Sequence, residues 1–256
     1  MIERIDVVVP ARDEEDLLAG CIDALVAARD ELLSAHPSVG CRVLVVLDGC
    51  SDGSADIARA ASARDAGIEW IEVPFGNVGM ARGAGVERLL DPGDPPSPSP
   101  GRATGATIGG VRHDRHWLCT TDADSRVPRD WLLTHLAAAR SGAWLALGRV
   151  HPAADESSPG SGTHEAWHRA HADPHARHVF GANLGVRADA YLSAGGFPRL
   201  RTSEDVGLYR AVLALGDLLP DAAGHIVDLQ SGVVETSARR VGRAPDGFAA
   251  YLRALP

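Results

Sequence analysis

Short apolar runs alternate with helically spaced apolar positions along the first half of the chain. Ile5–Val9 is β-branched, and from Glu14 onward apolar residues recur at the spacing of one helix face: Leu17, Leu18, Cys21, Ile22, Leu25 and Val26. Two similar strand–helix pairs follow, Arg42–Leu47 with Ser54–Arg64 and Ile68–Val73 with Val78–Leu90. Three such units in a row predict a mostly parallel sheet with right-handed crossovers and helices on both faces.

The second half continues this pattern less regularly. The predicted elements are a strand at Trp117–Thr121, a helix from Pro128 to Arg140, a strand at Trp144–Val150, and helices at Ala188–Ala194 and Glu204–Leu215. Asp13 is expected to cap the first helix, with Asp16 in its first turn. Between the third helix and the next strand, residues 91–110 hold five prolines among Gly, Ser and Thr, and we interpret them as a mobile insertion.

Composition restricts the class of protein. The chain has 256 residues, 45% of them hydrophobic, and a formal net charge of −9, which disfavours a nucleic-acid binder. The apolar runs are far shorter than the ~20 residues that span a bilayer, and the start of the chain lacks the features of a secretory signal. Four cysteines without CxxC spacing favour reduced thiols and a cytoplasmic location.

Acidic residues cluster where the predicted strands end. Asp13 and Glu14 follow the first strand, Asp48 follows the second, and Asp122 with Asp124 ends the fourth. In a parallel sheet ordered 3-2-1-4 by sequence, these ends meet at the crevice where strand order reverses, so the carboxylates should share a pocket.

Asp122 and Asp124 are two residues apart, and on an extended chain both side chains would face the same side. Hard oxygen ligands of this kind suit Mg²⁺ or Mn²⁺, which would let an acidic pocket accept a diphosphate. Solvated turn acids are the alternative explanation of this pair.

Several motifs occur in a fixed order along the chain. They are Pro10-Ala-Arg-Asp-Glu-Glu, Asp48-Gly-Cys-Ser-Asp-Gly-Ser, Asn77-x-Gly-x-Ala-Arg82, Thr121-Asp-Ala-Asp124, Gly181-Ala-Asn-Leu-Gly-Val-Arg187, Gly195-Gly-Phe197 and Ser203-Glu-Asp205. Together they resemble family 2 glycosyltransferases over roughly residues 5–229. Asp13 departs from the Asn usual in that family.

The resemblance implies an α/β GT-A fold, with a Rossmann-like, mostly parallel central sheet and a smaller acceptor-side C-terminal part. We expect one domain over residues 1–256, with a nucleotide-sugar-binding half at 1–125, an acceptor and catalytic half at 126–235, and a tail at 236–256. A Mn²⁺ or Mg²⁺ ion is the implied cofactor. The implied partners are a UDP-, GDP- or dTDP-sugar and a hydroxyl acceptor.

Site residues follow from the matching positions. The resemblance implies donor binding by Pro10, Ala11, Glu14, Asp48, Arg82 and Asp122, metal binding by Asp124 and Asp122, catalysis by Asp205 as general base with Glu204 beside it, and an acceptor-side loop at Gly181, Ala182 and Asn183. Three of these assignments have an open alternative: Arg82 as a surface helix cation, Glu204 and Asp205 as acids serving the helix dipole, and Gly181–Asn183 as a buried turn.

Three features stay open at this stage. The histidines His164, His168, His171, His175 and His178 could bind a metal or form a polar face near the acceptor, and Pro174 favours the second. His225 could reach the donor metal. Arg239, Arg240 and Arg243 could clamp a leaving diphosphate or form an exposed cationic end.

The resulting hypothesis is a hexosyltransferase-like, inverting, metal-dependent glycosyltransferase. A nucleotidyltransferase that makes nucleotide sugars is the first rival, but its basic phosphate loop is missing after the first strand, where Pro10–Glu15 is acidic. The second rival is an inactive nucleotide-sugar-binding protein. The retained Asp122, Asp124, Glu204 and Asp205 argue against it.

Overall fold

The computed structural model describes residues 1–91, 107–108, 111–153, 163–173, 177–217, 225–239 and 248–254. Most of the predicted insertion at 91–110 lies outside these ranges, so the expectation that it is mobile stays untested. Its described part is Asp91 and half of a small hairpin of β4 (Thr107–Ile108) and β5 (Val111–Arg112).

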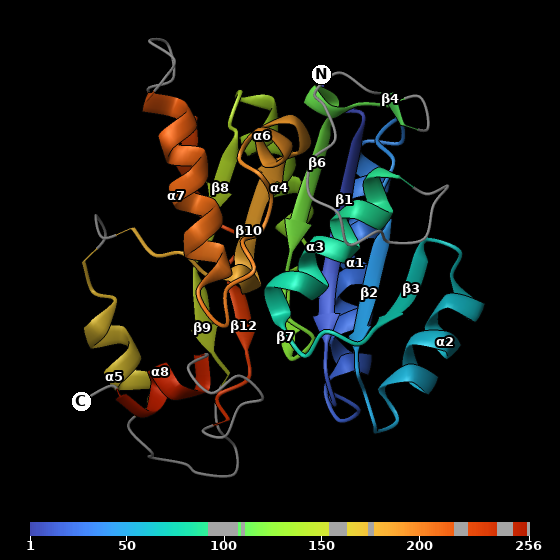
Figure 1. Cartoon of the computed structure of the whole chain (residues 1–256), viewed down its shortest axis with the longest axis vertical. Helices are drawn as coiled ribbons and strands as arrows, with labels where there is room; N and C mark the ends of the chain where they lie inside the picture. Colours follow the sequence, from blue (N-terminus) through green and yellow to red (C-terminus); the bar gives the residue numbers. More distant parts are fainter. Residues whose placement is uncertain are drawn as a thin grey trace.

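A seven-stranded sheet forms the centre of the molecule (Figure 1). Its order is β11-β8-β10-β6-β1-β2-β3, and β10 is antiparallel to both of its neighbours. The strands are β1 (Arg4–Ala11), β2 (Val43–Asp48), β3 (Ile68–Val73), β6 (His116–Thr120), β8 (Leu145–Leu147), β10 (Leu184–Arg187) and β11 (Ile226–Asp228). The segment β3-β2-β1-β6 is the predicted 3-2-1-4 order, so that prediction is confirmed.

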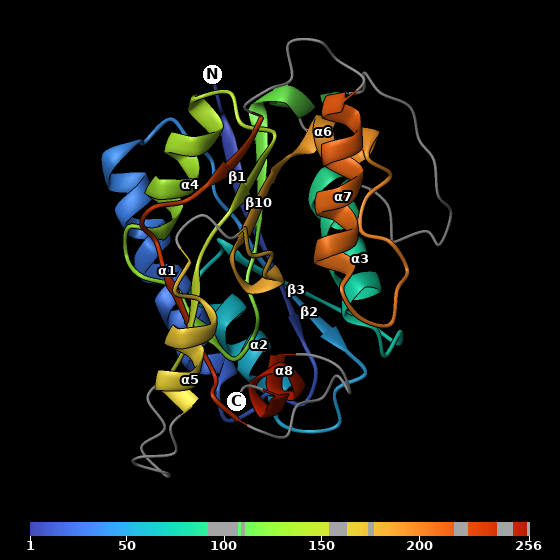
Figure 2. The ribbon, with the colours of Figure 1, turned by 90° about the vertical axis from the view of Figure 1, so that its left-hand side faces the viewer.

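Helices cover both faces of this sheet (Figure 2). One face carries α1 (Leu18–Ala35), α2 (Ser54–Arg64) and α4 (Trp131–Arg140), and the other carries α3 (Val78–Leu90), α6 (Ala188–Ser193) and α7 (Glu204–Asp217). Strand alternation explains the two cores: Val7 and Val9 of β1 pack with the first set and Val8 with the second. In α1, Leu18, Leu25 and Leu32 are fully buried, each contributing about 1.5–3 kcal/mol.

Smaller elements lie at the carboxyl end of the sheet. A three-stranded sheet joins β7 (Ser125–Arg126), β12 (Val234–Thr236) and β9 (Val150–Pro152). The 3₁₀ helices are η1 (His113–Arg115) and η2 (Gly181–Asn183), and two short helices, α5 (Thr163–Ala170) and α8 (Phe248–Ala254), meet through Trp167 and Phe248. The small sheet thereby brings the C-terminal segment beside β7, which follows β6.

Local details differ from the sequence predictions. The first helix begins at Leu18, because the chain turns through residues 15–17, so neither Asp13 nor Asp16 lies in its first turn. The fourth helix begins at Trp131, after Pro128. The predicted strand at Trp144–Val150 is two strands, β8 and β9, in different sheets. Bounds predicted from apolar spacing were accurate for α2, β3 and α3.

Candidate active site

A cleft of about 920 Å³ opens at the carboxyl ends of β1, β2 and β6. All but one of the predicted site residues line it: Pro10, Ala11, Glu14, Asp48, Arg82, Asp122, Asp124, Gly181, Ala182, Glu204 and Asp205. The segments that carry them are far apart in the sequence. The predicted shared pocket is therefore confirmed for the carboxylates of Glu14, Asp48, Asp122 and Asp124.

The turn after β1 is fastened to the turn after β2. Asp13 has a left-handed backbone, with φ of 52°, and its Oδ1 accepts from the Ser51 N–H at 2.7 Å and from the Ser51 hydroxyl at 3.1 Å. The Glu14 N–H donates to Ser54 Oγ at 2.8 Å. Asp, like Asn, tolerates this conformation, so the departure from the usual Asn keeps the turn and its hydrogen bonds.

Asp48 holds the loop that leads into α3. Its Oδ1 accepts the N–H groups of Phe75 at 2.6 Å and Gly76 at 2.7 Å, and its Oδ2 accepts that of Asn77 at 2.7 Å. Asn77 caps α3 by accepting from the Met80 N–H, and its Nδ2 donates to Leu200 O at 2.8 Å. Asp48 thus connects β2 to the loop before α3, and Asn77 connects that loop to the one before α7. Three of the roughly four acceptor positions of Asp48 are filled.

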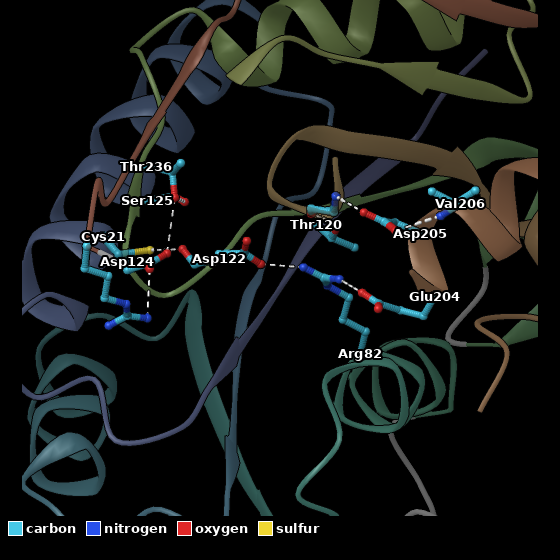
Figure 3. A network of polar contacts seen from close by, with 12 residues as sticks. Cys21, Arg82, Thr120, Asp122, Asp124, Ser125, Glu204, Asp205, Val206 and Thr236 are labelled. Carbon is cyan, nitrogen blue, oxygen red and sulfur yellow. Dashed lines mark hydrogen bonds and ion pairs between the residues drawn. The ribbon is translucent and has the colours of Figure 1, made fainter. Parts of the chain in front are cut away.

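The Asp122–Asp124 segment forms a turn, because β6 ends at Thr120. The extended-chain argument for their common direction was therefore wrong, although both carboxylates line the cleft. They have different partners. Asp122 pairs with Arg82 (Figure 3), and Asp124 pairs with Arg239 at 2.9 Å. Burial, and then the neighbouring Asp122, raise the pKa of Asp124 to about 6 although Arg239 opposes the shift.

Arg82 joins the two halves of the cleft (Figure 3). Its guanidinium, 3% exposed, pairs with Asp122 on one side and with Glu204 on the other. The surface-cation alternative for Arg82 is thereby excluded. Glycines make room for this arrangement: a side chain at Gly181 would collide with the Arg82 guanidinium, and one at Gly79 would lie 2.9 Å from Glu204 Cβ.

Glu204 and Asp205 have different surroundings. Glu204 is 4% exposed and bound to Arg82, and burial raises its pKa against the effect of that cation. Asp205 Oδ2 accepts the Gly181 N–H at 2.7 Å and Oδ1 accepts the Val206 N–H at 2.7 Å. Backbone amides therefore orient the Asp205 carboxylate at the cleft wall, whereas Glu204 is occupied in holding Arg82.

Arg239 does not form part of an exposed cationic end, because its guanidinium is paired with acidic residues of the cleft. It extends from the segment after β12 into the cleft, where its guanidinium binds both carboxylate oxygens of Glu14, one at 2.7 Å, as well as Asp124. Thr236 and Ser237 of the same segment contact Asp124 through a side-chain bond of 3.3 Å and a backbone bond of 3.1 Å. Arg240 and Arg243 lie outside the described residues.

Asn183 is the predicted site residue that the cleft does not include. It is the last residue of η2 and is fully buried, and its Nδ2 donates to Arg149 O at 2.8 Å and Gly232 O at 2.9 Å. Its Oδ1 accepts from Trp131 Nε1 at 2.8 Å and from His135 Nε2 at 3.3 Å. Asn183 does not line the cleft and its amide is saturated by the protein interior, so we interpret it as structural support behind the acceptor-side loop.

The histidine stripe is interrupted as Pro174 suggested, since α5 ends at Ala170. His171 and His178 line the cleft, with His171 stacked on Trp167 at 3.7 Å between ring centroids, while His164 and His175 have no described side chain. His225 lies on the Trp144 ring at 4.2 Å and outside the cleft lining, so it does not reach the acidic turn.

Part of the cleft wall was missed by sequence reasoning. Arg12, Arg177, Arg201, Tyr209, Arg210, Phe248 and Tyr251 also line it. Their spacing along the chain carries little signal, because they come from four separate regions: the turn after β1, the segment after residue 176, α7 with the loop before it, and α8. Their distance in sequence from the recognised motifs could have indicated some of them, because Arg201, Tyr209 and Arg210 lie within five residues of Glu204-Asp205.

The donor set at the acidic turn fits a divalent cation that also binds substrate oxygens. Among the residues that the structure describes, no three or more His, Cys, Asp and Glu side chains are placed to hold a metal. Asp122 and Asp124 nevertheless offer two carboxylates, with Asp124 buried beside like charge. Mg²⁺ and Mn²⁺ are commonly bound by one or two carboxylates and substrate phosphates, so these residues fit such an ion.

Comparison with known proteins identifies the fold. Residues 6–89 match the sequence profile described as glycosyl transferase family 2. No curated protein matches the sequence. TarS 1-349 of S. aureus, solved in complex with UDP-GlcNAc, superposes with a TM-score of 0.62 at 14% identity, over 96% of this chain and 61% of the TarS chain. The chain thus spans less than two thirds of that relative.

Two further structures are similar. The mannosyltransferase PcManGT of Pyrobaculum calidifontis, in complex with GDP-Man and Mn²⁺, has a TM-score of 0.61 at 17% identity, over 99% of this chain and 69% of its own. Glucosyl-3-phosphoglycerate synthase of Mycobacterium tuberculosis, with Mn²⁺, UDP and phosphoglyceric acid, has a TM-score of 0.54 at 14% identity, over 99% and 76%. At these identities the likeness concerns the fold, and it confirms the predicted GT-A architecture.

Proposed function

We propose that this chain, which carries glycosyl transferase family 2 sequence in residues 6–89 and has the GT-A fold, transfers a sugar from a nucleotide-diphosphate donor to an acceptor hydroxyl. The proposal includes inversion at the anomeric carbon and dependence on Mn²⁺ or Mg²⁺. One observation carries it: a single cleft holds a carboxylate-rich end at Glu14, Asp122 and Asp124 and, across Arg82, a carboxylate at Asp205 that backbone amides orient.

The acidic end suits the donor diphosphate. Asp122 and Asp124 would hold the divalent ion, which, when bound, neutralises the charge on the diphosphate and stabilises the departing nucleotide. PcManGT and the glucosyl-3-phosphoglycerate synthase were each solved with Mn²⁺ and a nucleotide, which supports this assignment. The nucleoside is expected between Pro10–Glu14 and Asp48, where Asp48 has one acceptor position left.

Asp205 is the proposed general base. It takes the proton of the acceptor hydroxyl while that oxygen forms a bond to the anomeric carbon, and the bond from that carbon to the diphosphate oxygen breaks, with its electron pair leaving on the nucleoside diphosphate. The two hydrogen bonds that it accepts from backbone N–H groups fix the direction of the carboxylate, and neither comes from a cation. Arg82 pairs with both Asp122 and Glu204, so it holds the donor end and the acceptor end of the cleft at a fixed separation.

A cytoplasmic location belongs to the same proposal. All four cysteines, Cys21, Cys41, Cys50 and Cys119, are free thiols. No helix among the described residues has the length and apolarity needed to cross a bilayer.

The test combines binding and turnover. Thermal unfolding is measured with a panel of UDP-, GDP- and dTDP-sugars, with and without Mn²⁺, because a ligand of the folded state raises the unfolding temperature by mass action. Release of nucleoside diphosphate is then measured for the wild type, Asp124→Asn and Asp205→Asn, and product anomers are assigned by NMR.

We expect Asp124→Asn to abolish the metal-dependent part of donor binding. Asp205→Asn should keep donor binding and lower turnover by at least 10²-fold, the usual scale for a general base. Asp189→Asn, on α6 and outside the cleft lining, serves as the matched control. Normal turnover in both cleft variants would refute the function, and formation of nucleotide sugar from a sugar phosphate and a nucleoside triphosphate would favour the nucleotidyltransferase.

A further inference from the structure

Two arginines on the Asp205 side of the cleft have no hydrogen-bond or ion-pair partner among the residues that the structure describes. Arg201, in the loop before α7, and Arg210, on α7, both line the cleft with exposed side chains. Within the described part of the chain, neither makes a hydrogen bond or ion pair. Guanidinium groups that are directed into a cleft and left uncompensated are available to a ligand.

Other arginines of the cleft are already paired. Arg82 binds Asp122 and Glu204, Arg239 binds Glu14 and Asp124, and Arg177 binds Asp228 through bonds of 2.8–3.2 Å. Arg12 is exposed on the donor side, after β1.

The two sides of the cleft therefore differ in charge. Among the described lining residues on the α7 side, Glu204 is paired with Arg82, and the charged groups that remain unpaired by an opposite charge are the Asp205 carboxylate and the guanidinium groups of Arg201 and Arg210. On the donor side, Arg82 and Arg239 are shared among Glu14, Asp122, Asp124 and Glu204, so carboxylates outnumber the guanidinium groups that pair with them. A cation fits the donor side and an anion fits the α7 side.

Both arginines stand on anchored backbone. The carbonyl of Leu200, next to Arg201, accepts the Asn77 Nδ2–H at 2.8 Å, and Asn77 is itself held by Asp48. Arg210 follows Asp205 by five residues on one helix, about 7.5 Å along its axis. Arg201 and Arg210 therefore line the same cleft as Asp205 from fixed positions on the backbone.

We propose that the acceptor is a small hydroxyl compound that carries a phosphate or carboxylate group, bound by Arg201 and Arg210. This inference rests on the proposed function, since it specifies the acceptor of that reaction. Guanidinium binds both anions through paired, charge-assisted hydrogen bonds. Because the chain has a net charge of −9, its long-range field opposes an anionic substrate, and local arginines are needed to retain one.

The first test measures binding alone. Isothermal titration calorimetry compares glycerol 3-phosphate, D-glycerate, glucose 6-phosphate and gluconate with neutral glycerol and glucose, at low and at high KCl. The proteins are the wild type, Arg201→Gln, Arg210→Gln, both Lys variants, and Arg64→Gln, which removes the same charge from an exposed position of α2 outside the cleft lining. Among the described residues neither cleft arginine makes a hydrogen bond or ion pair, so we expect the unfolding midpoints of the variants to stay close to that of the wild type.

We expect the wild type to bind at least one phosphate- or carboxylate-bearing compound at least tenfold more tightly than its neutral counterpart, with the preference reduced at high KCl. Each Gln variant should weaken that binding about tenfold, each Lys variant less, and Arg64→Gln not at all. Phosphate and carboxylate acceptors are distinguished by which compound of the panel binds. Equal binding of charged and neutral compounds, an equal loss in Arg64→Gln, or no binding by any anion of the panel would overturn the inference.

The second test separates this inference from the proposed function. Nucleotide-sugar binding and nucleotide release are measured on the same preparations with charged and neutral acceptors. A raised KM for the charged acceptor in the Gln variants, with unchanged donor binding, supports the inference. If sugar is transferred to neutral acceptors at a rate that neither arginine substitution changes, the inference is overturned and the proposed function stands. If no nucleotide sugar binds, the proposed function is refuted, and calorimetry still decides whether the two arginines bind an anion.

Discussion

Replacing Asn183 by Ala tests whether this residue belongs to the acceptor site or to the structural support behind it. Its side chain makes four hydrogen bonds in the protein interior, two donated to the carbonyls of Arg149 and Gly232 and two accepted from Trp131 and His135. The substitution leaves Gly232 O, Trp131 Nε1 and His135 Nε2 without this bond in the protein interior, whereas Arg149 O keeps the bond it accepts from the Val234 N–H at 3.0 Å. Each should cost about 1 kcal/mol, and more where no water enters.

The structure therefore predicts that Asn183→Ala loses about 3–5 kcal/mol of unfolding free energy. For a domain of this size, that loss corresponds to a fall of roughly 10 °C in the unfolding midpoint. Urea unfolding, followed by tryptophan fluorescence because Trp131 is one of the partners, gives the midpoint and the slope. The slope should stay constant if the unfolded state is unaffected.

Kinetics supply the discriminating result. Below its unfolding transition, the variant should keep the KM of the acceptor within about twofold, because the side chain does not line the cleft. Asn77→Ala, which removes a polar side chain that does line the cleft, is the control for a direct effect. A variant of unchanged stability with a strongly raised acceptor KM would refute the reasoning and restore Asn183 to the acceptor site.

Three further predictions follow from buried or paired groups. Burial lowers the pKa of His135 from 6.5 to about 4, so the neutral imidazole favours the folded state. Its contribution to the free energy of unfolding is fully present above pH 6.5 and is lost as the pH falls toward 4, by about 2 kcal/mol between pH 7 and pH 5. In urea unfolding, His135→Gln should reduce this dependence of the unfolding free energy on pH. Arg239→Gln leaves Asp124 without its cation, so Mn²⁺ alone should bind several-fold more tightly by electron paramagnetic resonance titration; weaker binding would contradict this. Asp48→Asn places an amide group next to three backbone N–H donors, so amide hydrogen exchange at residues 75–77 should accelerate. The affinity for all nucleotide sugars should fall by a similar factor. A loss of affinity confined to one nucleobase, with unchanged hydrogen exchange, would instead indicate that Asp48 contacts the base directly.

The elements and their order could be predicted from sequence because they depend on short-range patterns. Apolar spacing gave the bounds of α2, β3 and α3, since a helix or strand must turn its apolar positions toward the sheet wherever that sheet lies. Consecutive strand–helix units then restrict topology to right-handed crossovers, which places the ends of β1, β2 and β6 together. The pocket of Glu14, Asp48 and Asp122 follows from that restriction.

What each polar side chain does in the pocket was decided by the tertiary structure. Asn183 sits in the same short motif as Gly181, yet one faces the interior and the other the Arg82 guanidinium. Arg239 reaches Glu14 across 225 positions of chain. Such pairings depend on which loops meet after the sheet has formed, and the chain between them carries no periodic signal of where they will meet. Local patterns therefore specified the scaffold, while the partner of every buried charge was fixed by the packing of distant segments, because a charge removed from water must find its counter-ion wherever the fold provides one.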